Sequence, residues 1–434
     1  EVTQLSLFLK MLEDETTSTA NDMQVLFSTK ILPDLTTNIK CGNSLIGFEI
    51  MDYVMDFGTE ERRKYNPFDY KTAFPRVFNS KSEGFTVIVG NPPYVKEKTS
   101  KEIFDSVRLG KLEKYFQGKM DLWYFFTCYG LDLLKPKGVL GFIIPNNWVS
   151  NAGASKMRKK VIEDSKLIKL IDFGSYMVFE DASIQTMIMI IEKDSKTDNY
   201  SFKNQTFNVG KVKEEVIQKE LLEGSNNISI TINPIVKRKQ LKNKFLKFDN
   251  ENDKLILDNI LKSANFKLDP SKEVAQGIVT PQDSLNEKNA NILGQGFKKY
   301  DGIFLLSNDE LKTKGFTDDE MKLIKPLYTS SELGKYCSIK KNKLNVIYTD
   351  SSFKNISKIE SYPNIKNHLD KFKSIITSDN KPYGLHRARN EKFFTEEKIL
   401  SLRKCVEPTF TYSNEENYVL QSYNIIKSKR INLK

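Results

Sequence analysis

The sequence contains few of the residues that hold metals or form disulfides. Its 434 residues include four cysteines and two histidines. The cysteines form no Cys-x-x-Cys pair and are scattered, at Cys41, Cys128, Cys337 and Cys405. This pattern argues against structural zinc and fits a reducing cytoplasm, where we expect the protein to reside. With only His368 and His386, we expect neither a histidine metal cage nor a histidine-based triad, and we assign no metal site.

Long hydrophobic runs are also missing. No apolar stretch approaches the length of a membrane span and no signal peptide opens the chain, so we expect no membrane association. Hydrophobic residues still make up 39% of the sequence, which is enough to build cores for two or three domains. The chain begins with Glu1 rather than methionine and stops abruptly at Lys434. We therefore expect it to be a piece of a longer protein.

The excess positive charge lies in the C-terminal part of the chain. The formal net charge is +11. Residues 1–235 carry 30 Lys and Arg against 31 Asp and Glu, whereas residues 236–434 carry 37 against 25. This asymmetry predicts a polyanionic partner for the second part, most simply nucleic acid. The alternative is an ordinary lysine-rich, soluble surface.

The hydrophobic pattern predicts an α/β domain followed by a domain of another kind. Apolar runs typical of buried strands occur at residues 85–89, 139–144, 167–173 and 184–192. Strands that alternate with helices indicate a parallel, doubly wound, Rossmann-like sheet with helices on both faces. From about residue 195 this rhythm fades. We therefore place a domain boundary after residue 235 and predict that residues 236–434 form an irregular α+β domain.

The first of these strands ends in an unusual motif, TVIVGNPPY (residues 86–94). Ligands of an open parallel sheet bind beyond the carboxyl ends of its strands, where this motif should lie. Pro92 and Pro93 stiffen the loop and remove N–H donors. The Asn91 side chain and the Pro92 main chain then offer two carbonyl acceptors, which suit an –NH2 group. Tyr94 offers a flat face for the ring that bears this amine.

These features would activate an aromatic amine, whose nitrogen is a poor nucleophile because its lone pair is delocalised. Two acceptors that bind the amine hydrogens favour the electron-rich nitrogen of a transition state that attacks a methyl group. The alternative is a tight Asn-Pro turn with a surface tyrosine.

In this setting the NPPY motif resembles the catalytic loop of S-adenosylmethionine-dependent methyltransferases that act on exocyclic amines. NIKCGNSLIG (38–47) and YMVFEDASIQTMIMII (176–191) resemble the cofactor-adenine segment and the last strand pair of type IIG-like restriction–modification proteins. GFTDDEMKLIKPLYTSSELGKY (315–336) and YGLHRARNEKFFTEEKIL (383–400) resemble their target-recognition domain. The resemblance covers most of the chain.

The resemblance implies an N6-adenine DNA methyltransferase that flips its target base out of double-stranded DNA. The catalytic loop would be Asn91, Pro92, Pro93 and Tyr94, in which Asn91 and Pro92 hold the adenine amine. Tyr94 and Phe179 would stack on the two faces of the base. Asn43 would contact S-adenosylmethionine, although an ordinary turn asparagine is the alternative.

One departure concerns the glycine-rich cofactor loop of this family, which is absent from the sequence. In the expected order it would lie upstream of residue 1, so we expect the sheet to be incomplete at its N-terminus. Type IIG proteins often carry a nuclease as well, and a nuclease region of the same polypeptide would also lie upstream. Three short Glu-x-Lys matches, at Glu310, Glu320 and Glu396, are expected by accident in a chain this rich in Glu and Lys.

Two basic segments are candidates for DNA contacts. The first is a basic run that begins with Lys237, Arg238 and Lys239 and would contact phosphates or form a solvated hinge. The second is Arg387, Arg389 and Asn390, because Arg and Asn are the usual bidentate readers of guanine and adenine. A salt-bridged structural turn is the alternative for the second segment.

Two other functions stay open. One is an NPPY methyltransferase that acts on ribosomal RNA or protein glutamine, although such proteins lack a large basic C-terminal domain. The other is a catalytically inactive DNA-binding specificity module, and this alternative stays open because the glycine-rich cofactor loop is missing from the sequence.

Overall fold

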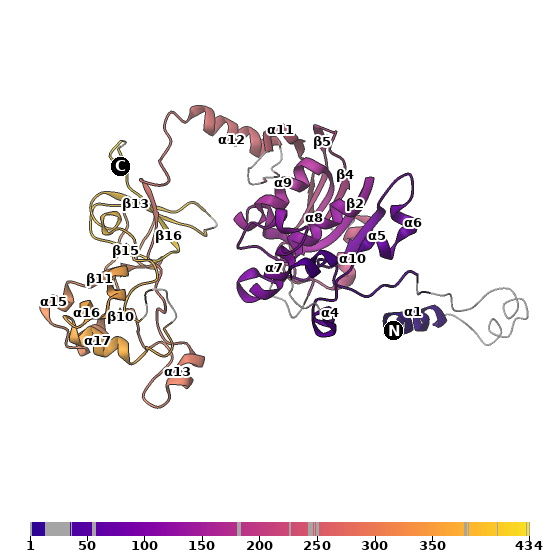
Figure 1. The fold of residues 1–434 in the computed structure, drawn as a ribbon. Helices are drawn as coiled ribbons and strands as arrows, with labels where there is room; N and C mark the ends of the chain where they lie inside the picture. Colours follow the sequence, from indigo (N-terminus) through magenta and orange to yellow (C-terminus); the bar gives the residue numbers. More distant parts are fainter. Residues whose placement is uncertain are drawn as a thin grey trace, which may run out of the picture. The chain divides into compact units, whose positions relative to one another are not determined.

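The structure is a computed structural model with two compact units, Glu1–Lys262 and Ser263–Lys434 (Figure 1). It describes residues 2–13, 35, 37–53, 58–179, 184–224, 227–241, 246, 248, 251–376, 380, 382–405, 407–430 and 432–433. The units divide later than the predicted boundary after residue 235. That position opens β8 (Ile235–Lys237), which pairs with β5 (Asn199–Ser201) inside the first unit. No helix in the described part is long and apolar enough to cross a membrane.

The first unit is built on a six-stranded sheet of order β1-β2-β4-β3-β6-β7. Its strands are β1 (Phe85–Gly90), β2 (Leu134–Pro145), β3 (Ser165–Asp172), β4 (Thr186–Lys193), β6 (Lys203–Phe207) and β7 (Ser229–Ile232). The α/β class is confirmed, but the sheet is mixed rather than parallel. β1, β2, β3 and β6 run in one direction, whereas β4 and β7 run in the other. The described part of the β3–β4 connection contains no helix, which fits a simple reversal rather than a crossover.

Helices cover both faces of this sheet, because alternate residues of its strands point to opposite sides. On one face, α8 (Trp123–Leu133) and α9 (Ser155–Asp164) pack on the fully buried Leu140, Ile144 and Met189. On the other face, α10 (Glu214–Glu223) buries Ile217 against β3 and β6. The other α-helices in the described part of this unit are α1 (Val2–Leu12), α4 (Thr59–Tyr65), α5 (Tyr70–Ala73), α6 (Pro75–Phe78), α7 (Lys101–Arg108), α11 (Arg238–Leu241) and α12 (Glu251–Ser263).

Strand β1 is more exposed than its sequence predicts. Val87 is 55% exposed and Val89 is 78% exposed. β1 is an edge strand, and in the described part of the chain no other strand pairs with its outer side. Next to Val89 in the register, a Cβ added to Gly141 would meet nothing within 4 Å. The prediction of a buried strand was wrong here, because this corner of the sheet is uncovered on one face and one edge.

The second unit contains two four-stranded antiparallel or mixed sheets, of order β10-β12-β11-β15 and β14-β13-β16-β9. The strands are β9 (Val274–Gln276), β10 (Leu305–Ser307), β11 (Ile324–Tyr328), β12 (Leu344–Ile347), β13 (Lys398–Leu402), β14 (Phe410–Ser413), β15 (Tyr418–Val419) and β16 (Tyr423–Ile426). The α-helices among its described residues are α13 (Glu287–Leu293), α14 (Asn308–Thr313), α15 (Asp318–Met321), α16 (Ile356–Ile359) and α17 (Pro363–Asp370). The unit has short strands without a βαβ rhythm, as the sequence predicted.

Candidate functional site

The NPPY loop leaves the carboxyl end of β1 and is fixed on both sides. Before the loop, Gly90 lies opposite Phe142 in the parallel ladder with β2. After it, the Leu122 amide donates to the Val95 carbonyl at 2.7 Å and the Glu97 amide donates to the Met120 carbonyl at 3.0 Å. The backbone of the motif is therefore fixed at both ends, by a strand before it and by a short antiparallel contact after it.

Tyr94 is tied to the neighbouring strand. Its hydroxyl donates to the main-chain carbonyl of Ile143 at 3.0 Å. Partial burial raises the pKa of Tyr94 to about 12, so the hydroxyl stays protonated at neutral pH. The ring lies 6.4 Å from the Phe179 ring, centroid to centroid, with a 64° angle between the planes. The structure thus brings the two predicted stacking residues together, but in an edge contact rather than as parallel plates.

Asn91 is exposed, whereas the next residue, Pro92, is buried. Within the described residues the Asn91 side chain makes no hydrogen bond, although it sits on a stiff loop. Its amide oxygen is therefore available to a substrate donor. A polar group held ready without a protein partner is what recognition of an amine requires, because no internal bond must first be broken.

The sequence analysis missed two polar residues at the same edge of the sheet. Asn146 follows β2 and Asp172 ends β3. The Asn146 side-chain amide donates to the two Asp172 carboxylate oxygens at 3.1 and 3.4 Å. Asp172 also accepts the Gly174 amide at 2.9 Å, at the start of the loop that carries Phe179. A polar residue directly after an apolar run was the available signal, but their pairing is not local in sequence.

Asn43 behaves as a turn residue in this structure. Its side-chain oxygen accepts the Leu45 amide at 3.1 Å, and its own amide donates to the Asn66 carbonyl at 2.6 Å. The strand pairing around it consists of a single bridge between Asn43 and Pro67. These contacts agree with the turn alternative, and the cofactor role of Asn43 stays a prediction.

Two glycines near Asn43 lie against neighbouring side chains. Around Asn43, a Cβ on Gly42 would lie 2.5 Å from the Phe68 ring, and one on Gly47 would overlap the Glu49 carboxylate. Gly42 therefore has no room for a side chain beside the Phe68 ring, whereas the Glu49 carboxylate next to Gly47 is the end of a flexible side chain. The Gly294-Gln295-Gly296 stretch ends α13 in the second unit and does not follow a strand.

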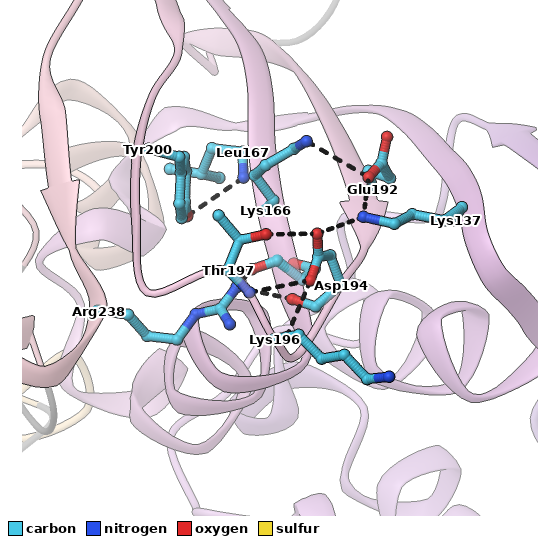
Figure 2. A network of polar contacts seen from close by, with 10 residues as sticks. Lys137, Lys166, Leu167, Glu192, Asp194, Lys196, Thr197, Tyr200 and Arg238 are labelled. Carbon is cyan, nitrogen blue, oxygen red and sulfur yellow. Dashed lines mark hydrogen bonds and ion pairs between the residues drawn. The ribbon is translucent and has the colours of Figure 1, made fainter.

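Arg238 is not available to DNA, which corrects one predicted contact. It is 5% exposed, and its guanidinium donates to the main-chain carbonyls of Ser165 and Asp194 at 2.9 and 2.6 Å (Figure 2). Beside it, Lys137 binds the buried Asp194 carboxylate at 2.5 Å and lowers the pKa of that group well below its usual range. The basic run therefore begins by anchoring the chain to the sheet. Such burial is hard to foresee, because arginine is rarely buried unless it is paired.

The neighbours of Arg238 remain at the surface. Lys237 is exposed, and Lys239 forms an exposed ion pair with Asp198 at 2.8 Å. The later lysines of the run, Lys242, Lys244 and Lys247, lie outside the described residues.

The three residues predicted in the second unit differ in availability. Arg387 is exposed, and its side chain has no partner within the described residues, while its main chain bridges to Val279. Arg389 donates to the Gly277 carbonyl at 3.3 Å and to the Gln276 side chain at 3.1 Å, and burial lowers its pKa. The Asn390 side chain accepts the Lys392 amide at 3.1 Å. Arg387 is thus the most available of the three, because structural contacts occupy the other two.

The Glu-x-Lys matches have structural roles. Glu310 and Glu320 complete capping boxes with Ser307 and Thr317 at the starts of α14 and α15. Glu396 forms an ion pair with Lys427 at 2.7 Å. The described residues contain no group of three or more His, Cys, Asp or Glu side chains that could hold a metal.

Comparison with known proteins points to one class, the methylases of restriction–modification systems. Residues 1–179 match the family model described as Eco57I restriction-modification methylase. The chain is 36% identical over 201 residues to the type II restriction enzyme and methyltransferase RM.Eco57I of Escherichia coli, a match that covers 45% of this chain and 18% of that protein. It is 30% identical over 119 residues to the type II methyltransferase M.BanIII of Aneurinibacillus aneurinilyticus, which covers 27% of this chain and 20% of that one.

The segment 1–179, which contains the NPPY loop and ends at Phe179, is therefore similar to the Eco57I-type restriction–modification methylases. The matched region spans about a fifth of the length of these relatives. Among solved structures, the type IIL restriction–modification enzyme MmeI in complex with DNA aligns with a TM-score of 0.49 at 12% identity, over 79% of this chain and 41% of that chain.

Proposed function

We propose that this chain is the modification and recognition portion of a DNA methyltransferase of a restriction–modification system, which methylates the N6 amine of adenine. The observation that carries this proposal is the exposed, unpaired Asn91 side chain on a loop fixed between β1 and β2. The match of this domain to restriction–modification methylases supports DNA as the substrate.

In this proposal the adenine leaves the duplex, because an amine inside the base stack cannot be reached. The Asn91 side-chain oxygen and the Pro92 carbonyl accept the two amine hydrogens. Tyr94 supports one face of the ring, and its bond to Ile143 keeps that support in place. Phe179 covers the other face after it turns from its edge contact into a parallel position. Stacking of this kind contributes about 1–3 kcal/mol per base, which offsets part of the unstacking cost.

The methyl donor in this proposal is S-adenosylmethionine, the cofactor of methyltransferases of this kind. Asn43 is the residue proposed to contact this cofactor, and Asn91, Pro92, Tyr94 and Phe179 act on the adenine. Asn91 needs no histidine as a base, since the proton can leave after the nitrogen has become positively charged.

The second unit is the proposed target-recognition part. Residues 263–434 carry 29 Lys and Arg against 21 Asp and Glu, a balance of +8 that favours a phosphate-rich partner. Arg387 is the residue of the predicted set that is free to reach a base edge.

The proposal is tested by single-molecule sequencing of host DNA after expression of the full-length gene. N6-methyladenine in one defined motif, absent from a host that carries the empty vector, is the expected result. Methylated cytosine in its place would overturn the adenine assignment. Unmodified DNA together with methylated ribosomal RNA or glutamine would support the RNA or protein alternative.

A further inference from the structure

An exposed tyrosine stands at the tip of a short hairpin in the second unit. Leu333 and Ile339 form an antiparallel bridge, and the Gly334 amide donates to the Ser338 carbonyl at 2.8 Å. Tyr336 lies at the turn with a φ of +65° and is 80% exposed. A left-handed conformation is unfavourable for a bulky residue, where glycine would be relaxed. A tyrosine at this position therefore has a cost to the stability of the fold.

The backbone of this tip is held firmly against β14. The Tyr336 amide donates to the Phe410 carbonyl at 2.7 Å, and the Tyr336 carbonyl accepts the Tyr412 amide at 2.6 Å. The Thr411 hydroxyl adds a bond to the Gly334 carbonyl at 2.6 Å. Three bonds thus fix the backbone of the tip, and the Tyr336 ring makes no aromatic or cation contact within the described residues. Because the backbone is already fixed and the ring is free of other contacts, less conformational entropy is lost when a ligand binds to the ring.

The surroundings of the ring are basic and partly apolar. Phe410, whose carbonyl holds the tip, is 49% exposed. Lys335 pairs with Glu407 at 2.6 Å, which brings the loop after β13 next to the hairpin. Lys340 and Lys341 on the hairpin and Lys404 on that loop are exposed, and they form no ion pair in the described part of the chain. Exposed cations on the hairpin and on the adjoining loop, together with a free aromatic ring, complement a polyanion that also presents flat rings for stacking, and nucleic acid has both properties.

We propose that Tyr336 is a DNA-contacting residue that stacks its ring on a nucleobase of the bound duplex. Lys340, Lys341 and Lys404 contact the flanking phosphates. The inference rests on the proposed function, since it takes DNA as the substrate. It adds a DNA contact that neither Arg387 nor the NPPY residues provide. Phosphate contacts of this kind fix the position of the protein along the duplex. The strength of the stacking contact depends instead on how far the duplex is locally distorted.

The test is the affinity of Tyr336 variants for a fluorescent duplex that carries the methylated motif, measured over a range of salt concentrations. Tyr336→Ala should raise Kd by about ten-fold, whereas Tyr336→Phe should stay within about two-fold of the wild type. Lys340→Gln with Lys341→Gln should reduce the slope of log K against log salt by about two. Tyr300→Ala is the matched control, because Tyr300 is also exposed in the second unit with a positive φ but contacts Lys299.

A glycine variant separates binding from folding. Tyr336→Gly should melt at the same temperature as the wild type or higher, since glycine relieves the left-handed backbone, yet it should lose affinity as Tyr336→Ala does. Wild-type Kd in Tyr336→Ala would overturn the inference and would leave the proposed function intact if the motif is still methylated. The same wild-type Kd would be the outcome if the tip serves a protein partner instead. A wild-type protein that neither binds nor methylates DNA would overturn both proposals.

Discussion

The Tyr94 hydroxyl donates to the main-chain carbonyl of Ile143 at 3.0 Å, across the two strands that carry the NPPY site. This bond joins the loop after β1 to the end of β2. It fixes the position of the one aromatic ring of the motif. The two roles that we propose for the loop, holding an amine and supporting a ring, can therefore be separated by mutation.

Tyr94→Phe should keep the ring and lose only the bond to Ile143. We expect methyl transfer to fall by about five-fold, the value of one hydrogen bond of roughly 1 kcal/mol. Tyr94→Ala removes the stacking face as well and should cost on the order of 100-fold. Single-turnover rates on a saturating duplex measure both. Equal losses in the two variants would mean that the hydroxyl, not the ring, is the functional group.

Asp172 fixes the start of the loop that carries Phe179. Asp172→Ala leaves the Asn146 side chain and the Gly174 amide without this acceptor, so the loop should lose its position. We expect a rate about ten-fold lower and a free energy of unfolding lower by about 1–2 kcal/mol. Asn147→Ala, a change of an exposed neighbour, is the control. A normal rate despite the lost stability would leave Asp172 with a structural role alone.

Arg238 should act on stability and not on DNA binding. Arg238→Ala removes the bonds to Ser165 and Asp194 and should lower the free energy of unfolding of the first unit by about 2–3 kcal/mol. The salt dependence of DNA binding should be unchanged. Lys237→Ala removes an exposed charge next to it and provides the comparison in both assays. A reduced salt slope in a folded Arg238→Ala protein would return this residue to the DNA interface.

The second unit should lose stability in mild acid through His368. Its Nε2 atom lies 2.9 Å from the Ile303 carbonyl, and burial lowers its pKa to about 4. In the unfolded chain this histidine binds a proton near pH 6.5. The contribution of neutral His368 to the free energy of unfolding is therefore complete above that pH and is lost as the pH falls towards 4. The total is about 3 kcal/mol, at about 1.4 kcal/mol per pH unit.

His368→Gln tests this prediction, because glutamine can donate to the Ile303 carbonyl without titrating. Chemical denaturation of the second unit between pH 7 and about 5 should show a smaller slope for the variant than for the wild type. Parallel curves would show that another group causes the acid sensitivity.

The elements and the motif could be predicted because their signals are local. The apolar runs that form β2, β3 and β4 are continuous, and NPPY follows β1 directly. What failed depends on contacts that are remote in sequence. The run TVIV cannot reveal that Val87 and Val89 lie at an uncovered edge, and a basic run does not show that one member, Arg238, is buried. The Asn146–Asp172 pair joins two strand ends that only the sheet order brings together.

The most direct test of the account is the transfer of labelled methyl groups to DNA by the full-length protein and its Asn91→Ala variant, with the modified nucleoside identified by mass spectrometry. Asn147→Ala, an exposed asparagine after β2, serves as the matched control. The account predicts N6-methyladenine from the wild type and the control, and a loss of at least about 100-fold in Asn91→Ala with DNA binding retained. Near-normal methylation by Asn91→Ala would contradict the central claim.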